Sequence, residues 1–263
     1  MARPNVLISI EATKETEVRS YGAQFMQSLL DEDPRLVPEL VSTSERFRDP
    51  FVDLDTFVKD WWAIPIKTYV DDRLVGQRFG GPHWKRRSAL ANRGMVAHGL
   101  TNLKGQRTPS TLWFQSRWDR SVDFFHLFEA WVEQANPDIG MLHVFGNAEL
   151  VEPRSNAATS FSVGSFGGKA KPGLPNMGWA MAYGTGFAHE VNFVGIENAK
   201  FPIHRVNDVV VVRITENLAD VVENFHFFLK RRAELKQFFR SDLFWIREGP
   251  TEPQAGDSVR SDA

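Results

Sequence analysis

The spacing of hydrophobic and polar positions predicts strands and helices along most of the chain. Apolar residues alternate with polar ones over residues 6–10, which is the pattern of a strand with one buried face. Residues 17–30 repeat their apolar positions at helical spacing. Asp33-Pro34 and Asp49-Pro50 each precede a further apolar run, and proline suits the first turn of a helix. The N-terminal quarter is therefore expected to contain one strand and two or three helices.

The middle of the chain begins with a mixed pattern and continues with clear elements. Between residues 67 and 107 the sequence Gly80-Gly81-Pro82 predicts a turn. Residues 111–118 and 139–145 are predicted strands. A densely apolar helix is expected between them, and Asn136-Pro137 is expected to end it.

The C-terminal part carries the strongest strand and helix patterns. Residues 206–214 contain four consecutive valines, which predicts a strand buried on both faces. Residues 219–239 are predicted to form one long helix with an apolar stripe. Its basic residues are expected to face water, namely Lys230, Arg231, Arg232 and Lys236.

Residues 164–186 hold seven glycines and two prolines, which predicts a long irregular loop beside a short strand at 179–183. Such loops are functional or disordered, and the apolar anchors within this one favour an ordered loop. Residues 249–263 are poor in apolar side chains and are predicted to be a disordered tail. The sequence thus predicts a single α+β domain over residues 1–248, with a mixed or antiparallel central sheet, packed helices and a long C-terminal helix.

Composition restricts the possible partners and compartments. The net charge is −2 and the isoelectric point is near 6.4, which argues against a large nucleic-acid surface, so no direct nucleic-acid partner is expected. The chain has no cysteine, which excludes thiol catalysis and cysteine-bound metals and fits a reducing compartment. The N-terminal apolar stretch is too short for a secretion signal, and no window approaches a membrane span. A cytoplasmic protein without a membrane partner is expected.

No motif in the sequence assigns a catalytic residue, a metal ligand or a cofactor. None of the seven histidines lies at the spacing of a local zinc motif. The sequence around Ser165 departs from G-x-S-x-G, and Gly184-Thr185-Gly186 lacks the third glycine of a dinucleotide-binding turn. His189-Glu190 could form an acid–base pair, but neighbouring residues on a strand point to opposite faces. No cofactor is therefore expected.

Two segments combine aromatic and basic residues, at 84–87 and at 113–118. Such a combination can stack bases and bind phosphates. The alternative is that Trp113 and Trp118 belong to a buried strand while Arg117 is solvated. We favour the second interpretation.

The acidic segment 49–72 is the remaining candidate. Asp53 and Asp55 lie at a predicted helix start, where carboxylates cap the helix and favour its dipole. The same segment mixes carboxylates with large aromatics, as does a surface that meets a basic partner. The candidate partner-binding residues are Asp53, Asp55, Trp61, Asp71 and Asp72, with Gly167 and Gly168 of the glycine-rich loop.

Three C-terminal segments resemble the immunity protein 52 family. They are GLPNMGWAMAYG (173–184), VNDVVVVRIT (206–215) and ENLADVVENFHFFLKRRAELKQFF (216–239). The resemblance implies a cytoplasmic inhibitor encoded beside a polymorphic toxin, in particular a DNase delivered by type VI secretion. It also implies no catalysis and no cofactor.

The sequence leaves two functions open. The first is an immunity protein that binds and neutralises a cognate nuclease toxin. The second is a hydrolase or transferase with its site around residues 164–190, including His189 and Glu190.

Overall fold

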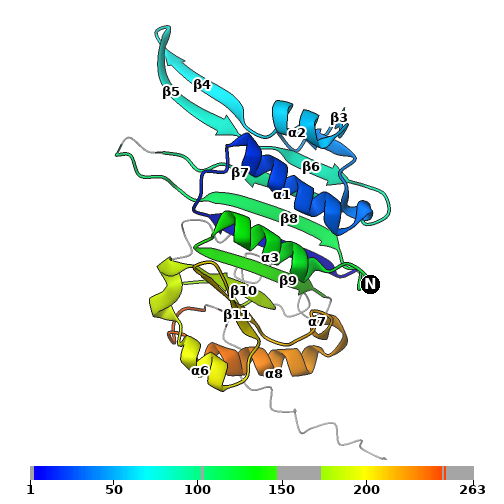
Figure 1. The fold of residues 1–263 in the computed structure, drawn as a ribbon, viewed down its shortest axis with the longest axis vertical. Coiled ribbons are helices and arrows are strands. Elements are labelled where there is room, and N and C mark those ends of the chain that lie inside the picture. The colour runs from blue at the N-terminus through cyan, green and yellow to red at the C-terminus, as the bar shows by residue number, and fades with distance from the viewer. Residues whose placement is uncertain (1–2, 102–103, 147–172, 245, 247–263) are drawn as a thin grey trace, which may run out of the picture.

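The chain is built around one large antiparallel sheet (Figure 1). The computed structural model describes residues 3–101, 104–146, 173–244 and 246. Within these ranges the strand order is β11–β12–β10–β9–β1–β8–β7–β6–β2–β3, and all neighbours pair antiparallel. The strands are β1 (Asn5–Ala12), β2 (Leu40–Ser42), β3 (Asp49–Pro50), β6 (His83–Arg86), β7 (Asn92–Ala97), β8 (Ser110–Arg117), β9 (Ile139–Phe145), β10 (Ala180–Tyr183), β11 (Ile203–Val206) and β12 (Val209–Arg213). Strands from both halves of the chain share this sheet, which confirms the α+β prediction with an antiparallel sheet.

Strand β1 lies in the middle of the sheet, between β8 and β9. Its existence is confirmed, but the expectation of one buried face is wrong, because every residue from Val6 to Ala12 is buried. The polar positions Ser9 and Glu11 point into the protein rather than into water. The carboxylate of Glu11 accepts a hydrogen bond from the Thr111 hydroxyl on β8, which compensates part of its desolvation.

Helices α1 (Arg19–Glu32) and α3 (Phe124–Ala135) pack side by side on one face of the central strands (Figure 1). The rings of Phe25 and Trp131 stack with their centroids 4.2 Å apart, and the Trp131 Nε1 donates to the Phe25 carbonyl. Gly22 lets α1 approach the Trp62 ring, because a Cβ there would lie 2.3 Å from that ring. Helix α3 ends at Asn136, as the pair Asn136-Pro137 predicted, and Asn136 adopts the left-handed conformation common at helix C-termini.

The two helices expected at Asp33-Pro34 and Asp49-Pro50 are corrected by the structure. The first is a single 3₁₀ turn, η1 (Pro34–Leu36), after which the chain enters β2. Asp49-Pro50 forms β3, and α2 (Leu54–Asp60) begins four residues later. The apolar residues that suggested a longer first helix belong to a strand, since short apolar runs do not distinguish the two.

The C-terminal part contains β10 as predicted, η2 (Thr185–Glu190), α6 (Phe193–Asn198) and a hairpin of β11 and β12. The single strand expected over 206–214 is therefore two strands, separated by a turn in which Asn207 has a φ of 54°. The four valines of β12 are buried on both faces, as predicted.

The expected long helix over 219–239 is also two elements, α7 (Asp220–Glu223) and α8 (Phe225–Lys236). Asn224 leaves the helical conformation between them, which suits a residue whose side chain competes for backbone groups. Arg232 was expected in water but is buried, with its guanidinium against the Phe228 ring and one nitrogen donating to the Met177 carbonyl. Lys230 is exposed, as predicted.

A hairpin of β4 (Ile64–Val70) and β5 (Arg73–Gly80) forms a second, two-stranded sheet. It projects from the body of the molecule beside α2 (Figure 1). The sequence pattern predicted only the turn that follows β5. No helix in the described part of the chain is long and apolar enough to cross a membrane.

Candidate functional site

Asp53 and Asp55 lie at the start of α2. Asp53 is the N-cap residue, and its carboxylate accepts a hydrogen bond of 2.7 Å from the Thr56 backbone N–H. That bond lowers the pKa of Asp53 from its usual range. Asp55 is exposed in the first helical turn, and Trp61 is half-buried at the helix end. The predicted capping role of Asp53 is confirmed.

The cap and the charge of Asp53 can be separated experimentally. We expect Asp53→Ala to lower the free energy of unfolding, because the Thr56 N–H loses its acceptor. Asp53→Asn keeps an acceptor and removes the charge, so it should preserve most of that stability. Urea unfolding of both variants checks this, and equal losses would contradict a capping role.

Asp71 and Asp72 form the turn at the tip of the β4–β5 hairpin. Their φ angles are 46° and 58°, and positive values at both central residues match the twist of a two-residue hairpin turn. The seven residues of β4 span about 20 Å at a strand's rise per residue, which separates these two carboxylates from α2. The acidic segment 49–72 is thus divided into two groups, and Gly167 and Gly168 lie outside the described residues.

The hairpin exposes large apolar side chains that the fold does not cover. Ile66, Tyr69, Val70 and Leu74 are 39%, 56%, 55% and 53% exposed. These four residues are named the hairpin patch. Tyr69 and Leu74 are directly opposite each other, at a register shift that follows Thr68. An isolated two-stranded hairpin is marginally stable in water, and several large apolar side chains exposed on one short hairpin favour an interaction site.

Sequence reasoning missed the hairpin patch for a physical reason. The turn signal is Asp71-Asp72, which is weaker than Asn-Gly or Asp-Gly in the same position. Two short strand-forming runs flank it and could have identified the hairpin. Their exposure is a tertiary property, because nothing in the runs themselves shows that no other element packs on them.

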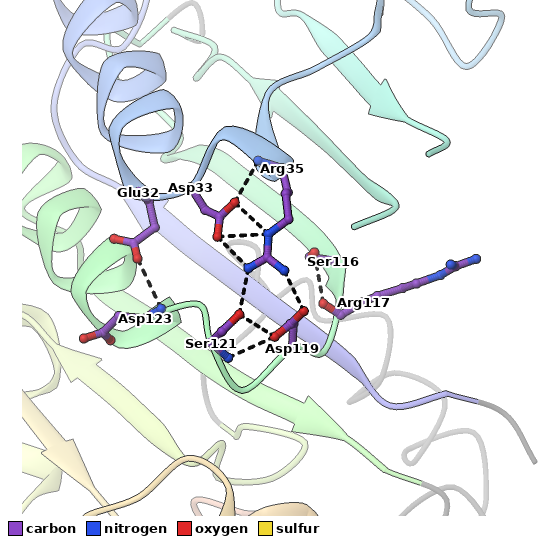
Figure 2. Close-up of polar contacts among 8 residues, drawn as sticks. All are labelled: Glu32, Asp33, Arg35, Ser116, Arg117, Asp119, Ser121 and Asp123. Atoms are coloured by element: carbon purple, nitrogen blue, oxygen red, sulfur yellow. Dashed lines mark hydrogen bonds and ion pairs between the residues drawn. The ribbon is translucent and has the colours of Figure 1, made fainter. Parts of the chain in front are cut away.

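Arg35 is the centre of a surface ion network (Figure 2). Its guanidinium donates to Asp33 at 2.7 Å, to Asp119 at 2.9 Å and to the Ser121 hydroxyl at 2.7 Å. The hydrogen bond from Arg35 lowers the pKa of Asp33, whose carboxylate also caps η1. Because these donors are already directed at protein oxygens, the network fastens η1 to the loop before α3 and is structural.

His98 lies in a buried polar cluster below α1. Its Nε2 is 2.6 Å from the Trp62 carbonyl, so this nitrogen carries a proton, and Nδ1 is 2.8 Å from the Thr16 hydroxyl. The Thr16 and Ser110 hydroxyl oxygens are 2.8 Å apart. The combination resembles a nucleophile with its base, yet all three residues are buried. It connects the loop after β1 to β8 and to Trp62.

Burial lowers the pKa of His98, which gives stability a pH dependence. The unfolded chain takes up a proton near pH 6.5, whereas folded His98 resists it. Stability from this residue is therefore complete above about pH 6.5 and is lost as the pH falls towards the folded pKa. We expect His98→Gln to lose less stability than the wild type between about pH 7.5 and about pH 5.5. Equal losses in urea unfolding would contradict this.

His189 and Glu190 lie on η2 rather than on a strand, which corrects their expected geometry. Their side chains are on the same side, with His189 Nε2 3.4 Å from Glu190 Oε1. The other Glu190 oxygen accepts a 2.6 Å hydrogen bond from Arg240, and His189 is exposed. The Glu190 carboxylate is thus paired with Arg240, and this ion pair connects η2 to the chain after α8.

A surface cavity of about 360 Å³ lies between α3 and the β11–β12 hairpin. Two histidine–carboxylate pairs flank it, His126 with Glu32 at 2.7 Å and His204 with Glu129 at 2.5 Å. The hydrogen bond to Glu32 raises the pKa of His126. Among the described residues, no group of three histidine or acidic side chains is arranged to hold a metal ion.

Comparisons with known proteins identify a solved structure with a similar fold. No known family and no curated protein matches the chain by sequence. Among solved structures, it is similar to the T6SS protein PA0821 of Pseudomonas aeruginosa, with a TM-score of 0.54 and 14% identity. The similarity covers 95% of this chain and 77% of that one. At this identity the similarity shows a shared fold, and no match to the immunity protein 52 family accompanies it.

Proposed function

We propose that this chain is an immunity protein of a type VI secretion system, which binds a cognate nuclease toxin through the hairpin patch. The single observation that carries the proposal is the projecting β4–β5 hairpin with four exposed apolar side chains. A surface of this kind gains stability when a partner covers it, since each apolar side chain fully removed from water contributes about 1.5–3 kcal/mol.

The two carboxylates in the turn of the hairpin support a basic partner at the tip, whereas the strands themselves carry the basic residues Lys67, Arg73 and Arg78. Asp71 and Asp72 place two carboxylates next to Tyr69 and Leu74. A nuclease presents lysine or arginine around the cleft that holds phosphates. Opposite charges at the rim speed encounter, while buried aromatic and aliphatic anchors slow dissociation. The arrangement suits inhibition by occupation of such a cleft.

The shared fold supports the type VI part of the proposal. The structural neighbour is described as a T6SS protein, and its similarity extends over nearly the whole of this chain. The resemblance of residues 173–184, 206–215 and 216–239 to the immunity protein 52 family points in the same direction. Inhibition by binding requires no catalytic residue or cofactor in this chain, so we propose a protein that acts by binding rather than by catalysis.

A hydrolase or transferase at residues 164–190 is the less favoured function. Of its two named residues, Glu190 is held by Arg240 and His189 is solvated. The glycines that suggested a functional loop fall partly outside the described residues, and residues 173–184 are buried as part of the core.

Protection in living cells tests the proposal. An open reading frame adjacent to this gene would be expressed in a bacterial host with and without this chain. We expect the neighbouring product to stop growth and degrade DNA, and this chain to restore growth. Unrestored growth with both proteins expressed would contradict the immunity function.

A further inference from the structure

The three strands β6, β7 and β8 have one buried face and one partly exposed face. On β8 the alternate residues Ser110, Leu112, Phe114 and Ser116 are buried, whereas those between them are half-buried or exposed. The same alternation continues on β7, where Arg93 is exposed, and on β6, where Lys85 is half-buried. The face opposite α1 and α3 is therefore partly exposed over these strands, and it is named the outer face.

Basic residues are aligned across the outer face. Lys85 on β6 is directly opposite Arg93 on β7, and Arg93 is directly opposite Gln115 on β8. Arg117 lies on the same face two residues after Gln115. Like charges directly opposite each other on a sheet are destabilising, so this alignment has a cost in the free protein.

Lys85 and Arg93 on the outer face contact aromatic rings and a side-chain amide rather than carboxylates. Arg93 donates from Nε and Nη2 to the Gln115 side-chain oxygen at 3.0 and 2.8 Å, and its guanidinium lies 5.1 Å from the Trp113 ring centroid. The Lys85 ammonium lies 5.7 Å from the Phe47 ring centroid. These contacts fix the Arg93 guanidinium while leaving its Nη1 donors available.

Arg117 extends away from the Arg35 network into the surroundings (Figure 2). Its side chain is exposed. Within the ranges that the structure describes, Lys85, Arg93 and Arg117 form no ion pair, although arginines elsewhere, such as Arg35 and Arg107, do. Three aligned cations without an anion fit a partner that supplies one.

We propose that the outer face binds an acidic segment, rich in aspartate and glutamate, of a partner protein. A guanidinium that lies over the Trp113 ring and is hydrogen-bonded to Gln115 presents fixed donors, and fixed donors match a carboxylate. The partner's carboxylates would also relieve the repulsion between Lys85 and Arg93. This proposal concerns a different surface from the hairpin patch and stands independently of the toxin-binding function.

Nucleic acid fits the outer face less well than an acidic segment does. Base stacking needs free aromatic faces, but Arg93 lies over Trp113 and Lys85 lies over Phe47. Binding to a phosphate backbone draws on many cations, and this chain has a net charge of −2.

The test uses a fluorescent peptide of about twelve residues composed of glutamate and glycine, with an oligothymidylate of similar length as the competing probe. We expect the full-length chain to bind the peptide, with affinity that falls as salt rises. The triple variant Lys85→Gln, Arg93→Gln, Arg117→Gln should bind at least about tenfold more weakly. The matched control, Lys67→Gln, Arg73→Gln, Arg78→Gln on the hairpin, removes the same charge and should change affinity less than about twofold.

Three results would overturn the proposal: no peptide binding by the wild type, equal weakening in both triple variants, or tighter binding of the oligothymidylate at the same three residues. Thermal melting identifies a misfolded variant. If the outer-face triple variant misfolds, Arg117→Gln alone provides the test, because its side chain is exposed. That variant should bind the peptide about threefold more weakly, and unchanged affinity would contradict the proposal.

Discussion

Replacing Phe228 with alanine is expected to lower the free energy of unfolding by about 3–5 kcal/mol. The ring is fully buried, stacks on His143 with a centroid distance of 5.7 Å, and contacts Phe225 on its own helix. The guanidinium of Arg232 lies 4.9 Å from the Phe228 centroid, so truncation leaves a buried cation beside a cavity. The loss should therefore fall in the upper part of the range.

The adjacent residue supplies a matched control for this prediction. Phe227 has the same side chain but is 42% exposed. Phe227→Ala should change stability by less than about 1 kcal/mol, because most surface substitutions have small effects. Urea unfolding at neutral pH measures both variants. Similar losses for the two would show that α8 packs through a different face.

The second large effect is expected at the hairpin patch. The triple variant Tyr69→Ser, Val70→Ser, Leu74→Ser should weaken toxin binding at least about 100-fold and abolish protection of the cell. Its own melting temperature should change little, because these side chains are exposed in the free protein. Growth of cells that express the toxin with either chain gives the readout.

A control variant removes the same number of exposed apolar side chains elsewhere. Val18→Ser, Val194→Ser, Phe227→Ser changes residues on α6, on α8 and before α1. This variant should protect cells as well as the wild type does. Loss of protection in the control, with protection kept in the hairpin variant, would place the interface outside the hairpin.

The sequence predicted best those elements whose own hydrophobic pattern indicates that they are buried. The valine run of β12 and the apolar helix α3 need no information about their neighbours, because each shows its environment in its own composition. Asn136-Pro137 ended α3 as expected, since both residues act on the local backbone. Structural features that are determined by residues nearby in the chain can be predicted from a single sequence.

The errors arose where a neighbour determines the outcome. The alternation in β1 suggested a solvated face, but the residues of both faces are buried, and Thr111 provides a donor for Glu11. Arg232 looked like a solvated helix residue, but it lies against Phe228 in the core. Long polar side chains can be buried when a ring or a carbonyl accepts them, and periodicity does not reveal this.

Only part of the candidate site was predicted from the sequence, because the rest of it depends on tertiary structure. Asp53 was recognised as a helix cap because its role depends on residues three positions away. Asp71 and Asp72 were grouped with it by proximity in sequence, although β4 carries them to the far end of the hairpin. Exposure of Tyr69 and Leu74 could not be foreseen, because it depends on which elements do not pack against them.

Hydrogen exchange tests the central claim, that the hairpin is the toxin-binding surface, most directly. Backbone amides of β4 and β5 would be compared in the free chain and in its complex with a catalytically inactive form of the neighbouring gene product. Coverage by a partner should slow exchange across the hairpin, most strongly around Tyr69 and Leu74, where the free hairpin is open to solvent. Unchanged exchange over β4 and β5 in a complex that forms would contradict the account.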